Sequence, residues 1–334
     1  MSRKKQKTSD SRSRKLQRRA ITAVCVVLML ILAGLGGYAA GWFANRSRIR
    51  SDAERYRAMY SPEPTPTVSA TPEPTPISTD TPRPEPEITP EAAPTPTPFV
   101  AGGEQPVILD EPIGTRNPET LVYALPTAPP IQEAFQRLIS YNPDTVGYLD
   151  IQGLLSLPVT QRVNDNDHYL NHNFDGEESR EGCLFLDGVN RLVPEDDCLI
   201  VYGHNMKNGA MFGRLDSYES PVFARTHPLV RFDTIYENRL YVPFAAFTAS
   251  MESDDGHYFD VRQFVFDETQ FELFTLKMQS RSAVKLPVDV RFGDRLLLLV
   301  TCDYTNNQGR FILGLRQLRP DETEDGMRQR FNAL

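Results

Sequence analysis

The sequence has few cysteines, no excess of positive charge and no visible internal repeat. Its 334 residues include only four cysteines, which are too few and too scattered for a disulfide-bonded scaffold. The formal net charge of −8 argues against a nucleic-acid-binding protein, because such domains are generally basic. We therefore expect neither a disulfide framework nor a nucleic-acid partner.

Charge is missing altogether from residues 20–44, which follow a strongly basic segment, residues 1–19. A helix of this length spans roughly 37 Å, enough to cross the ~30 Å hydrocarbon core of a bilayer. A cleaved signal peptide is the alternative, but its apolar region is usually only about 7–15 residues long. We predict an uncleaved transmembrane anchor at residues 20–44. Its basic cytoplasmic tail, residues 1–19, would leave the rest of the chain outside the cell.

Apolar side chains are scarce in residues 61–98, a tract rich in proline, threonine and glutamate. Such a composition buries too little apolar surface to offset chain entropy, so this tract should not fold. Proline stiffens it into an extended stalk of at most about 120 Å. We predict a stalk or linker over residues 45–128, and two roles stay open: holding a domain away from the membrane within the wall, or a passive connection.

Short strand-like runs dominate residues 129–320, separated by Gly, Asn and Asp turns. Eight such runs predict a mainly β domain, a closed antiparallel barrel with helical additions. Residues 321–334 are expected to be a C-terminal tail. The expected strands are Val146–Ile151, Leu157–Thr160, Cys183–Leu186, Leu199–Tyr202, Leu229–Phe232, Leu240–Ala249, Leu296–Thr301 and Phe311–Leu318.

Two helices are expected in this domain. An early one follows from a stripe of apolar residues, Ile131, Phe135, Leu138 and Ile139, which Asn142-Pro143 ends. A late one begins at a capping box of Asp267 and Gln270 and carries an apolar face of Phe271, Phe274 and Met278.

Three side chains at strand ends predict the chemistry. The apolar run from Leu296 to Val300 ends at Cys302, another apolar run ends at His204, and Arg310 opens the strand that follows Cys302. Only the thiolate attacks well, and a histidine, which titrates near neutral pH, can generate it and protonate a leaving amine. An arginine stays protonated and can hold an oxyanion. These residues predict a cysteine acyl-transfer site.

The four cysteines need separate interpretation. Locally, Cys302 also fits a small buried hydrophobic residue at the end of a strand. Cys25 lies in the expected membrane span. Cys183 and Cys198 begin two strands that can pair, so they are either buried thiols or a cross-strand disulfide, and we favour thiols.

A metal or a phosphate-cradling loop is not expected. His168 and His172 are four residues apart, which suits a metal only on a helix, and their Asn/Asp/Gly-rich segment is typical of a loop. Cysteine phosphatases need a tight loop whose amides cradle phosphate between the thiolate and an arginine. Here seven residues separate Cys302 from Arg310, and only Gly309 among them is glycine. We expect no metal and no cofactor.

Four segments resemble the class B sortases, membrane-anchored cysteine transpeptidases of Gram-positive bacteria. The resemblance runs in register from about Ile131 to Leu318, and its most specific part is YGHNM followed by MFG. The segments are Asn142–Tyr148 (NPDTVGY), Asp165–Gly176 (DNDHYLNHNFDG), Tyr202–Gly213 (YGHNMKNGAMFG), and Thr301–Tyr304 (TCDY) with Arg310.

The resemblance implies a sortase β-barrel with N-terminal helices and a helix before the cysteine strand. It implies that Cys302 is the nucleophile, His204 the general acid/base, and Arg310 the ligand of the oxyanion or of the substrate backbone. The family's peptide groove includes an Asn-x-x-x-Leu element, which implies substrate contacts for Asn166 and Leu170. The Pro-Thr-Glu stalk is not part of the family pattern.

The resemblance also implies substrates. Cys302 would attack a Thr carbonyl in the C-terminal sorting motif of an exported protein and form a thioester. An amine of a cell-wall precursor or of a pilin lysine would then accept the acyl group. Two alternatives stay open: a hydrolytic cysteine protease, which these residues do not separate from a transpeptidase, and a non-catalytic wall-binding module on a stalk.

Overall fold

The computed structural model describes residues 127–250, 256–302 and 309–334 of the chain, an N-terminal helix over residues 47–59 with Tyr60, and helical positions between 29 and 44. Residues 1–28 and 61–126 lie outside the described part, so the predicted cytoplasmic tail and stalk do too. Of the predicted anchor, only some positions are described. Within the described residues, no helix combines the length and the apolar character needed to cross a membrane.

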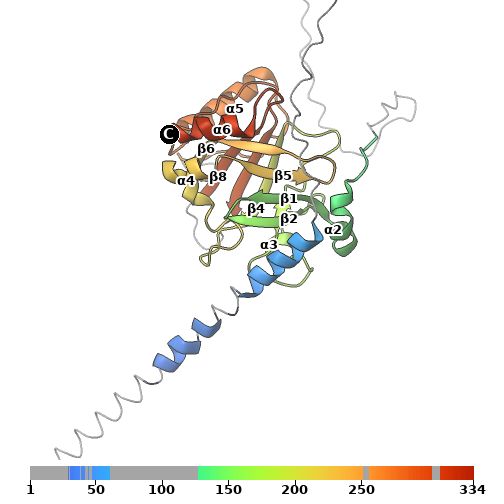
Figure 1. The fold of residues 1–334 in the computed structure, drawn as a ribbon, viewed down its shortest axis with the longest axis vertical. Helices are drawn as coiled ribbons and strands as arrows, with labels where there is room; N and C mark the ends of the chain where they lie inside the picture. Colours follow the sequence, from blue (N-terminus) through green and yellow to red (C-terminus); the bar gives the residue numbers. More distant parts are fainter. Residues whose placement is uncertain are drawn as a thin grey trace, which may run out of the picture. The chain divides into compact units, whose positions relative to one another are not determined.

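Eight strands close into one barrel in the order β1-β2-β3-β4-β7-β8-β6-β5, and β5 pairs with β1 (Figure 1). The predicted closed eight-stranded barrel is confirmed. Strand β6 has the predicted bounds, and the other strands differ by one or two residues at one or both ends. The strands are β1 (Thr145–Ile151), β2 (Leu155–Thr160), β3 (Leu184–Leu186), β4 (Cys198–His204), β5 (Val230–Thr234), β6 (Leu240–Ala249), β7 (Leu296–Cys302) and β8 (Arg310–Gln317).

The prediction that all strands pair antiparallel is wrong at two places. Strand β2 pairs with β3, and β4 with β7, in the parallel sense. Parallel pairing needs a long crossover connection, and the chain between β4 and β7 supplies one that includes two other strands. Hydrophobic patterns of single strands carry no information on pairing direction, which is why the sequence did not show it.

Within residues 127–334, the described helices are short except for α5. The capping box that begins α5 is confirmed, because the Asp267 carboxylate accepts from the Gln270 backbone N–H at 2.8 Å and the Gln270 side chain accepts from the Asp267 N–H at 3.1 Å. Phe271, Phe274 and Met278 are buried as predicted. The helices are η1 (Glu133–Phe135), α2 (Gln136–Tyr141), α3 (His168–Asn171), η2 (Leu215–Glu219), α4 (Pro221–Thr226), α5 (Glu268–Arg281) and α6 (Glu324–Asn332).

The prediction of one late helix followed by a tail is incomplete, because α6 occupies most of the expected tail. Its Met327 and Phe331 are buried, at 1% and 0% exposed. The Thr323 hydroxyl caps its first turn by accepting from the Gly326 N–H at 3.1 Å. The helix α6 packs against α4, and Figure 1 shows it at the end of the barrel opposite the N-terminal helix.

The early apolar stripe is only partly buried. Phe135 and Leu138 are fully buried, whereas Ile131 precedes the helical residues and is 42% exposed. The core of the barrel lies around β7, where all five residues from Leu296 to Val300 are at most 1% exposed. This strand lies between β4 and β8, which explains its unbroken apolar run.

Candidate active site

The parallel register of β4 and β7 places His204 and Cys302 opposite each other at the carboxyl ends of the two strands. The position before His204 in β4 is a glycine, Gly203. A Cβ there would lie 2.5 Å from Leu184 Cδ2 and 2.9 Å from the Phe212 ring. The backbone of Cys302 is described, but its side chain and residues 303–308, including Tyr304, lie outside the described part. The backbones thus bring the two predicted residues to one rim.

Arg310 begins β8 on the other side of β7. The antiparallel register of β7 and β8 pairs Val300 with Ile312. Continuing this register by two residues along each strand brings Cys302 level with Arg310. The Phe311 N–H donates to the Thr301 hydroxyl at 2.9 Å, which holds the strands together beside this point. All three predicted catalytic positions therefore converge at one end of the barrel.

The His204 imidazole is half-buried and is held through one nitrogen. Its Nε2 lies 2.7 Å from the backbone carbonyl oxygen of Leu170 in α3. A carbonyl oxygen only accepts, so Nε2 carries the hydrogen, and the neutral ring keeps its lone pair on Nδ1. If His204 is the predicted acid/base, Nδ1 is the nitrogen that would transfer the proton.

Of the two predicted substrate-binding residues, Leu170 contacts this histidine and Asn166 bonds to another loop. The Leu170 side chain is buried, 6% exposed, and its backbone carbonyl contacts the His204 ring. The Asn166 side chain is half-buried, and its Oδ1 accepts from the Gly188 N–H at 2.7 Å. Their contact with a substrate stays a prediction.

Asn142 and Tyr169, which the sequence did not single out, fix α3 beneath the histidine. The Tyr169 hydroxyl donates to the Asp144 carboxylate at 2.8 Å. The Asn142 amide lies 3.2 Å from the same hydroxyl and donates to the Phe174 carbonyl at 2.9 Å. Burial raises the pKa of Tyr169, so the phenol stays protonated as a donor. The NPDTVGY segment could have pointed to Asn142, since it opens one of the four resembling segments.

Residues 205–213, which we call the His204 loop, fold back onto the histidine. The Phe212 N–H donates to the His204 carbonyl at 2.9 Å, and Asn205 and Met211 form an isolated β-bridge. Met211 adopts a positive φ of 50°. A Cβ at Gly213 would lie 2.1 Å from the Met206 carbonyl oxygen, so only glycine fits there. This close packing restricts which residue types fit at the positions of the YGHNM…MFG motif.

The N-terminal helix docks on the barrel beside α3. Asp175 accepts from Arg55 at 2.5 Å and from the Tyr56 hydroxyl at 3.0 Å. Nearer the start of the helix, Arg48 pairs with Glu177 at 2.8 Å. Burial opposes ionisation of Asp175, but the hydrogen bonds from Arg55, Tyr141 and Tyr56 together outweigh it and lower the pKa of this carboxyl. The helix therefore belongs to the catalytic domain, which the sequence prediction had assigned to the linker.

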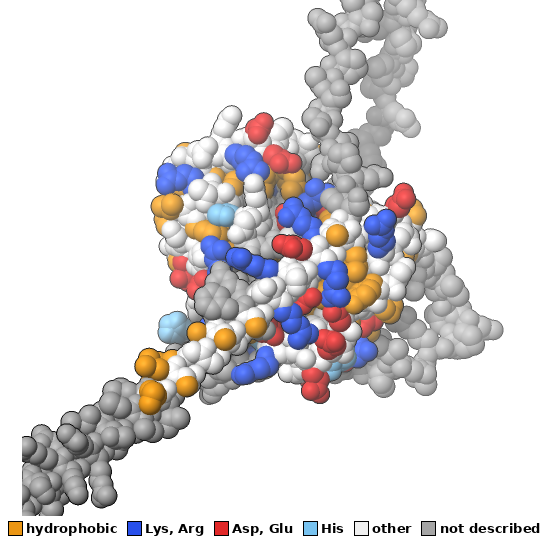
Figure 2. Space-filling view, turned by 60° about the horizontal axis from the view of Figure 1, so that its bottom comes forward, with side chains coloured by type: hydrophobic (Ala, Val, Ile, Leu, Met, Phe, Trp, Pro, Cys, Tyr) orange, Lys and Arg blue, Asp and Glu red, His pale blue; other side chains and the backbone are white. Residues whose placement is uncertain are grey.

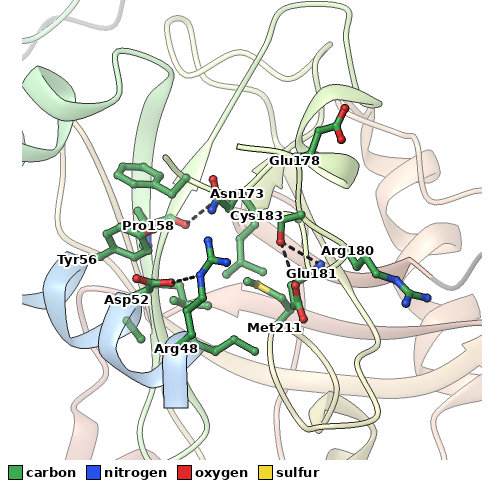
Figure 3. Close-up of a pocket in the computed structure, with 17 residues that line it drawn as sticks. Arg48, Asp52, Tyr56, Pro158, Asn173, Glu178, Arg180, Glu181, Cys183 and Met211 are labelled. Carbon is green, nitrogen blue, oxygen red and sulfur yellow. Dashed lines mark hydrogen bonds and ion pairs between the residues drawn. The ribbon is translucent and has the colours of Figure 1, made fainter. Parts of the chain in front are cut away.

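Two crevices separate this helix from the barrel. The first, about 200 Å³, lies over Pro158 and Cys183 (Figure 3). Figure 3 shows that its polar wall comes from Arg48 and Asp52 of the helix on one side and from Glu181 on the other. The second crevice, about 260 Å³, lies along the His204 loop. Ile49, Ala53, Leu157 and Met211 line both crevices.

His168 and His172 lie in and directly after α3, so the expectation of a loop is wrong for residues 168–171. Their rings stack with centroids 4.1 Å apart, and His172 Nδ1 lies 2.9 Å from the His168 carbonyl. In the described part of the chain, no group of three or more His, Cys, Asp or Glu side chains could hold a metal.

Cys183 and Cys198 are free and buried, which confirms the thiol alternative. Burial raises the pKa of the Cys183 thiol to about 12 and also raises the pKa of Cys198. Both therefore stay protonated and unreactive at neutral pH. Cys25 lies outside the described residues.

The chain has relatives of known family. It is 32% identical to sortase B of Listeria monocytogenes serovar 1/2a over 186 residues, which are 55% of this chain and 73% of that protein. The solved Staphylococcus aureus sortase B–substrate complex is 26% identical with a TM-score of 0.52, covering 57% of this chain and 87% of that one. A solved sortase B complexed with triglycine is 26% identical with a TM-score of 0.52, covering 56% and 86%. No family model matches the chain.

The two solved sortase B structures share the fold of this chain. The identity to the Listeria protein extends over most of that protein's length. The chain belongs to the sortase B family and is an enzyme of the sortase type, a cysteine transpeptidase.

Proposed function

We propose that this enzyme cleaves a C-terminal sorting motif of exported proteins through a thioester on Cys302. The observation that carries the proposal is the parallel register that pairs His204 with Cys302 at the rim of the barrel. Arg310 begins the neighbouring strand at the same rim. A thiol, an imidazole and a guanidinium at one site are sufficient for acyl transfer.

The first half-reaction forms the acyl-enzyme. His204 takes the thiol proton on Nδ1, and the Cys302 thiolate attacks the carbonyl carbon of a Thr residue in the motif. Arg310 stabilises the oxyanion of the tetrahedral intermediate. His204 then returns its proton to the departing amide nitrogen, the C–N bond breaks, and the thioester remains. Asn166 and Leu170 would contact the motif.

The second half-reaction transfers the acyl group to an amine, from a cell-wall precursor or a pilin lysine. The S. aureus relative has been solved with a substrate and another sortase B with triglycine, a peptide that has a free amine at one end. These complexes support a peptide donor and an amine acceptor for this chain. If water replaced the amine, the same site would act as a hydrolytic cysteine protease.

We place the enzyme at the cell membrane, in a single-pass topology. The uncharged residues 20–44 would be the anchor, the basic residues 1–19 would stay in the cytoplasm, and the barrel would face the outside. The stalk at 61–98 would carry the domain into the wall. This arrangement would bring the site to exported substrates.

The test is cleavage of a peptide library by the full-length chain, with product analysis with and without an added amine. We expect one motif to be cleaved, a thioester on Cys302 to accumulate without amine, and ligation when amine is present. Cys302→Ala should abolish acyl-enzyme formation and leave the unfolding temperature unchanged. Cleavage by that variant would overturn the proposal, and failure of Cys302 to react with a thiol-directed peptide analogue would favour a non-catalytic wall-binding module.

A further inference from the structure

The second crevice runs between the N-terminal helix and the His204 loop, and it combines an apolar wall with basic edges. Apolar side chains form its floor, with Leu154 and Leu155 beside the Leu157 and Met211 that it shares with the first crevice. Two arginines stand at its edges, Arg50 from the helix and Arg214 from the end of the His204 loop. Its volume of about 260 Å³ suits a short amino-acid-sized group.

The charged side chains among the described residues that line this crevice are both arginines. No aspartate or glutamate is among the described residues that line it, whereas the first crevice has Asp52, Glu178 and Glu181. Among the described residues, neither Arg50 nor Arg214 forms an ion pair, although Arg48 and Arg55 on the same helix both do. Figure 2 shows basic side chains on both sides of this helix where it crosses the barrel. Two guanidinium groups are therefore available to an anion.

Arg214 contacts the His204 loop through its aliphatic stem. A Cβ added at Gly209 would be 3.3 Å from Arg214 Cδ. Gly209 has a positive φ of 79°, a conformation that favours glycine. The arginine thus lays its stem on the His204 loop and is itself exposed.

The crevice lies along the His204 loop. An attacking amine has to give a proton to His204, so it must approach beside that ring. Residues Asn208 to Met211 line the crevice, and the next residue, Phe212, donates its N–H to the His204 carbonyl. A molecule in the crevice would therefore lie against the segment that directly follows His204.

We propose that the second crevice binds the amine acceptor and that Arg50 and Arg214 select acceptors that carry a carboxylate or phosphate near the amine. This inference rests on the proposed function and adds the chemical class of the second substrate. The acceptor amine attacks the thioester carbonyl carbon, its proton passes to His204, the C–N bond forms and the C–S bond breaks. Cys302 leaves as thiolate and regains the proton from His204.

The test uses the full-length chain, a donor peptide chosen from the library, and two acceptors that differ in one charge. Triglycine ends in a carboxylate, and triglycine amide does not. A second pair, 6-aminohexanoate and its amide, covers acceptors with a longer arm. We expect kcat/KM for the carboxylate acceptor to exceed that for the amide by about fivefold at low salt, since partly exposed charge pairs give effects of this size. High salt should reduce the ratio.

The double variant Arg50→Gln/Arg214→Gln should lower this ratio to about one. A matched control is Arg137→Gln/Lys285→Gln, which removes two exposed cations outside the crevice and should leave the ratio unchanged. Charge reversal, Arg50→Glu/Arg214→Glu, should favour the amides.

Several results would overturn the inference. Equal use of acid and amide by the wild type would do so, and so would a double variant that keeps the wild-type ratio. A double variant that slows both acceptors equally would mean that the arginines position the helix. Loss of binding to anionic vesicles with an unchanged ratio would assign them to the membrane surface. Donor hydrolysis without any ligation would exclude an acceptor site, whereas absence of donor cleavage by the wild type would overturn the proposed function itself.

Discussion

At the scale of single residues, the Leu170 carbonyl orients the His204 ring through Nε2. The bond from Nε2 to the Leu170 carbonyl is 2.7 Å long. A glutamine at this position can present an N–H where Nε2 lies but offers no group equivalent to a titratable Nδ1. The two functions of the imidazole, orientation and proton transfer, can therefore be separated by substitution.

We expect His204→Gln to lower the rate of acyl-enzyme formation on the order of 10²- to 10⁴-fold, the usual contribution of a positioned acid/base. Its unfolding temperature should stay near that of the wild type, because the amide keeps the contact with Leu170. Single-turnover acylation and thermal unfolding measure the two effects. His204→Ala serves as the control that loses both. Wild-type acylation by the glutamine variant would remove His204 from the mechanism.

Sequence reasoning reached the residues that carry reactive side chains but not those that hold them. Cys302 and His204 stand at the ends of apolar runs, and this pattern is visible in one dimension. The Leu170 carbonyl is a backbone group, so no residue type marks it. Asp175 lies in a polar segment, and its partner Arg55 is 120 residues away in the chain. Such contacts become visible only when the segments are placed in space.

At the scale of elements, the N-terminal helix is attached to the barrel through the buried rings of Tyr56 and the adjoining Tyr60 and through Asp175. The Asp175 carboxylate accepts from both Arg55 and Tyr56 and is 16% exposed. Hydrogen bonds to a partly buried charge are worth about 1–3 kcal/mol. The neighbouring pair of Arg48 and Glu177 is 62% exposed at both side chains, and exposed pairs contribute little.

Asp175→Asn should therefore lower the free energy of unfolding by about 1–3 kcal/mol and increase hydrogen exchange in residues 47–59. Glu177→Gln is the matched control and should change stability by less than about 0.5 kcal/mol. Urea unfolding and hydrogen exchange of the full-length chain test both. Equal effects of the two variants would show that the Asp175 contacts do not hold the helix.

The last helix, α6, is the element whose existence the sequence did not indicate. It has only two buried apolar residues, Met327 and Phe331, one turn apart, and such a short pattern is not distinguishable from a polar tail. Strand β6 is the opposite case. Its ten residues form a long apolar run, and the predicted and observed bounds agree.

Phe331→Ala should lower the free energy of unfolding by about 3–5 kcal/mol, because the ring is fully buried. Leu276→Ala on α5 is a suitable control, since Leu276 is 62% exposed and should change stability by less than about 0.5 kcal/mol. Urea unfolding measures both. If removal of residues 321–334 left stability unchanged, α6 would be dispensable for the fold.

At the scale of the whole molecule, arginine–carboxylate pairs stabilise both ends of the barrel. Asp175 ties the N-terminal helix to the α3 end. At the other end Arg316, fully buried, donates to Glu322 at 2.5 Å and 2.7 Å. Burial opposes ionisation of Glu322, but the hydrogen bonds from Arg316 and from the Arg319 backbone, with the charges of both arginines, together outweigh it and lower its pKa. The Arg319 hydrogen bond lowers the pKa of Asp289. The net charge of −8 gave no indication of these pairs, because it counts charges and not their neighbours.

These lowered pKa values determine how stability depends on pH. A carboxyl whose pKa is lower in the folded than in the unfolded chain stabilises the fold above its unfolded pKa, near pH 4, and this contribution disappears as the pH falls further. The contribution of these carboxyls should therefore be nearly level from pH 7 to about pH 5 and fall below about pH 4. Glu322→Gln should be less stable than the wild type at pH 7, and the difference should shrink at about pH 3. Urea unfolding at these pH values tests the expectation. A wild type that gained stability on acidification would show that these arginine pairs do not govern the acid response of the fold.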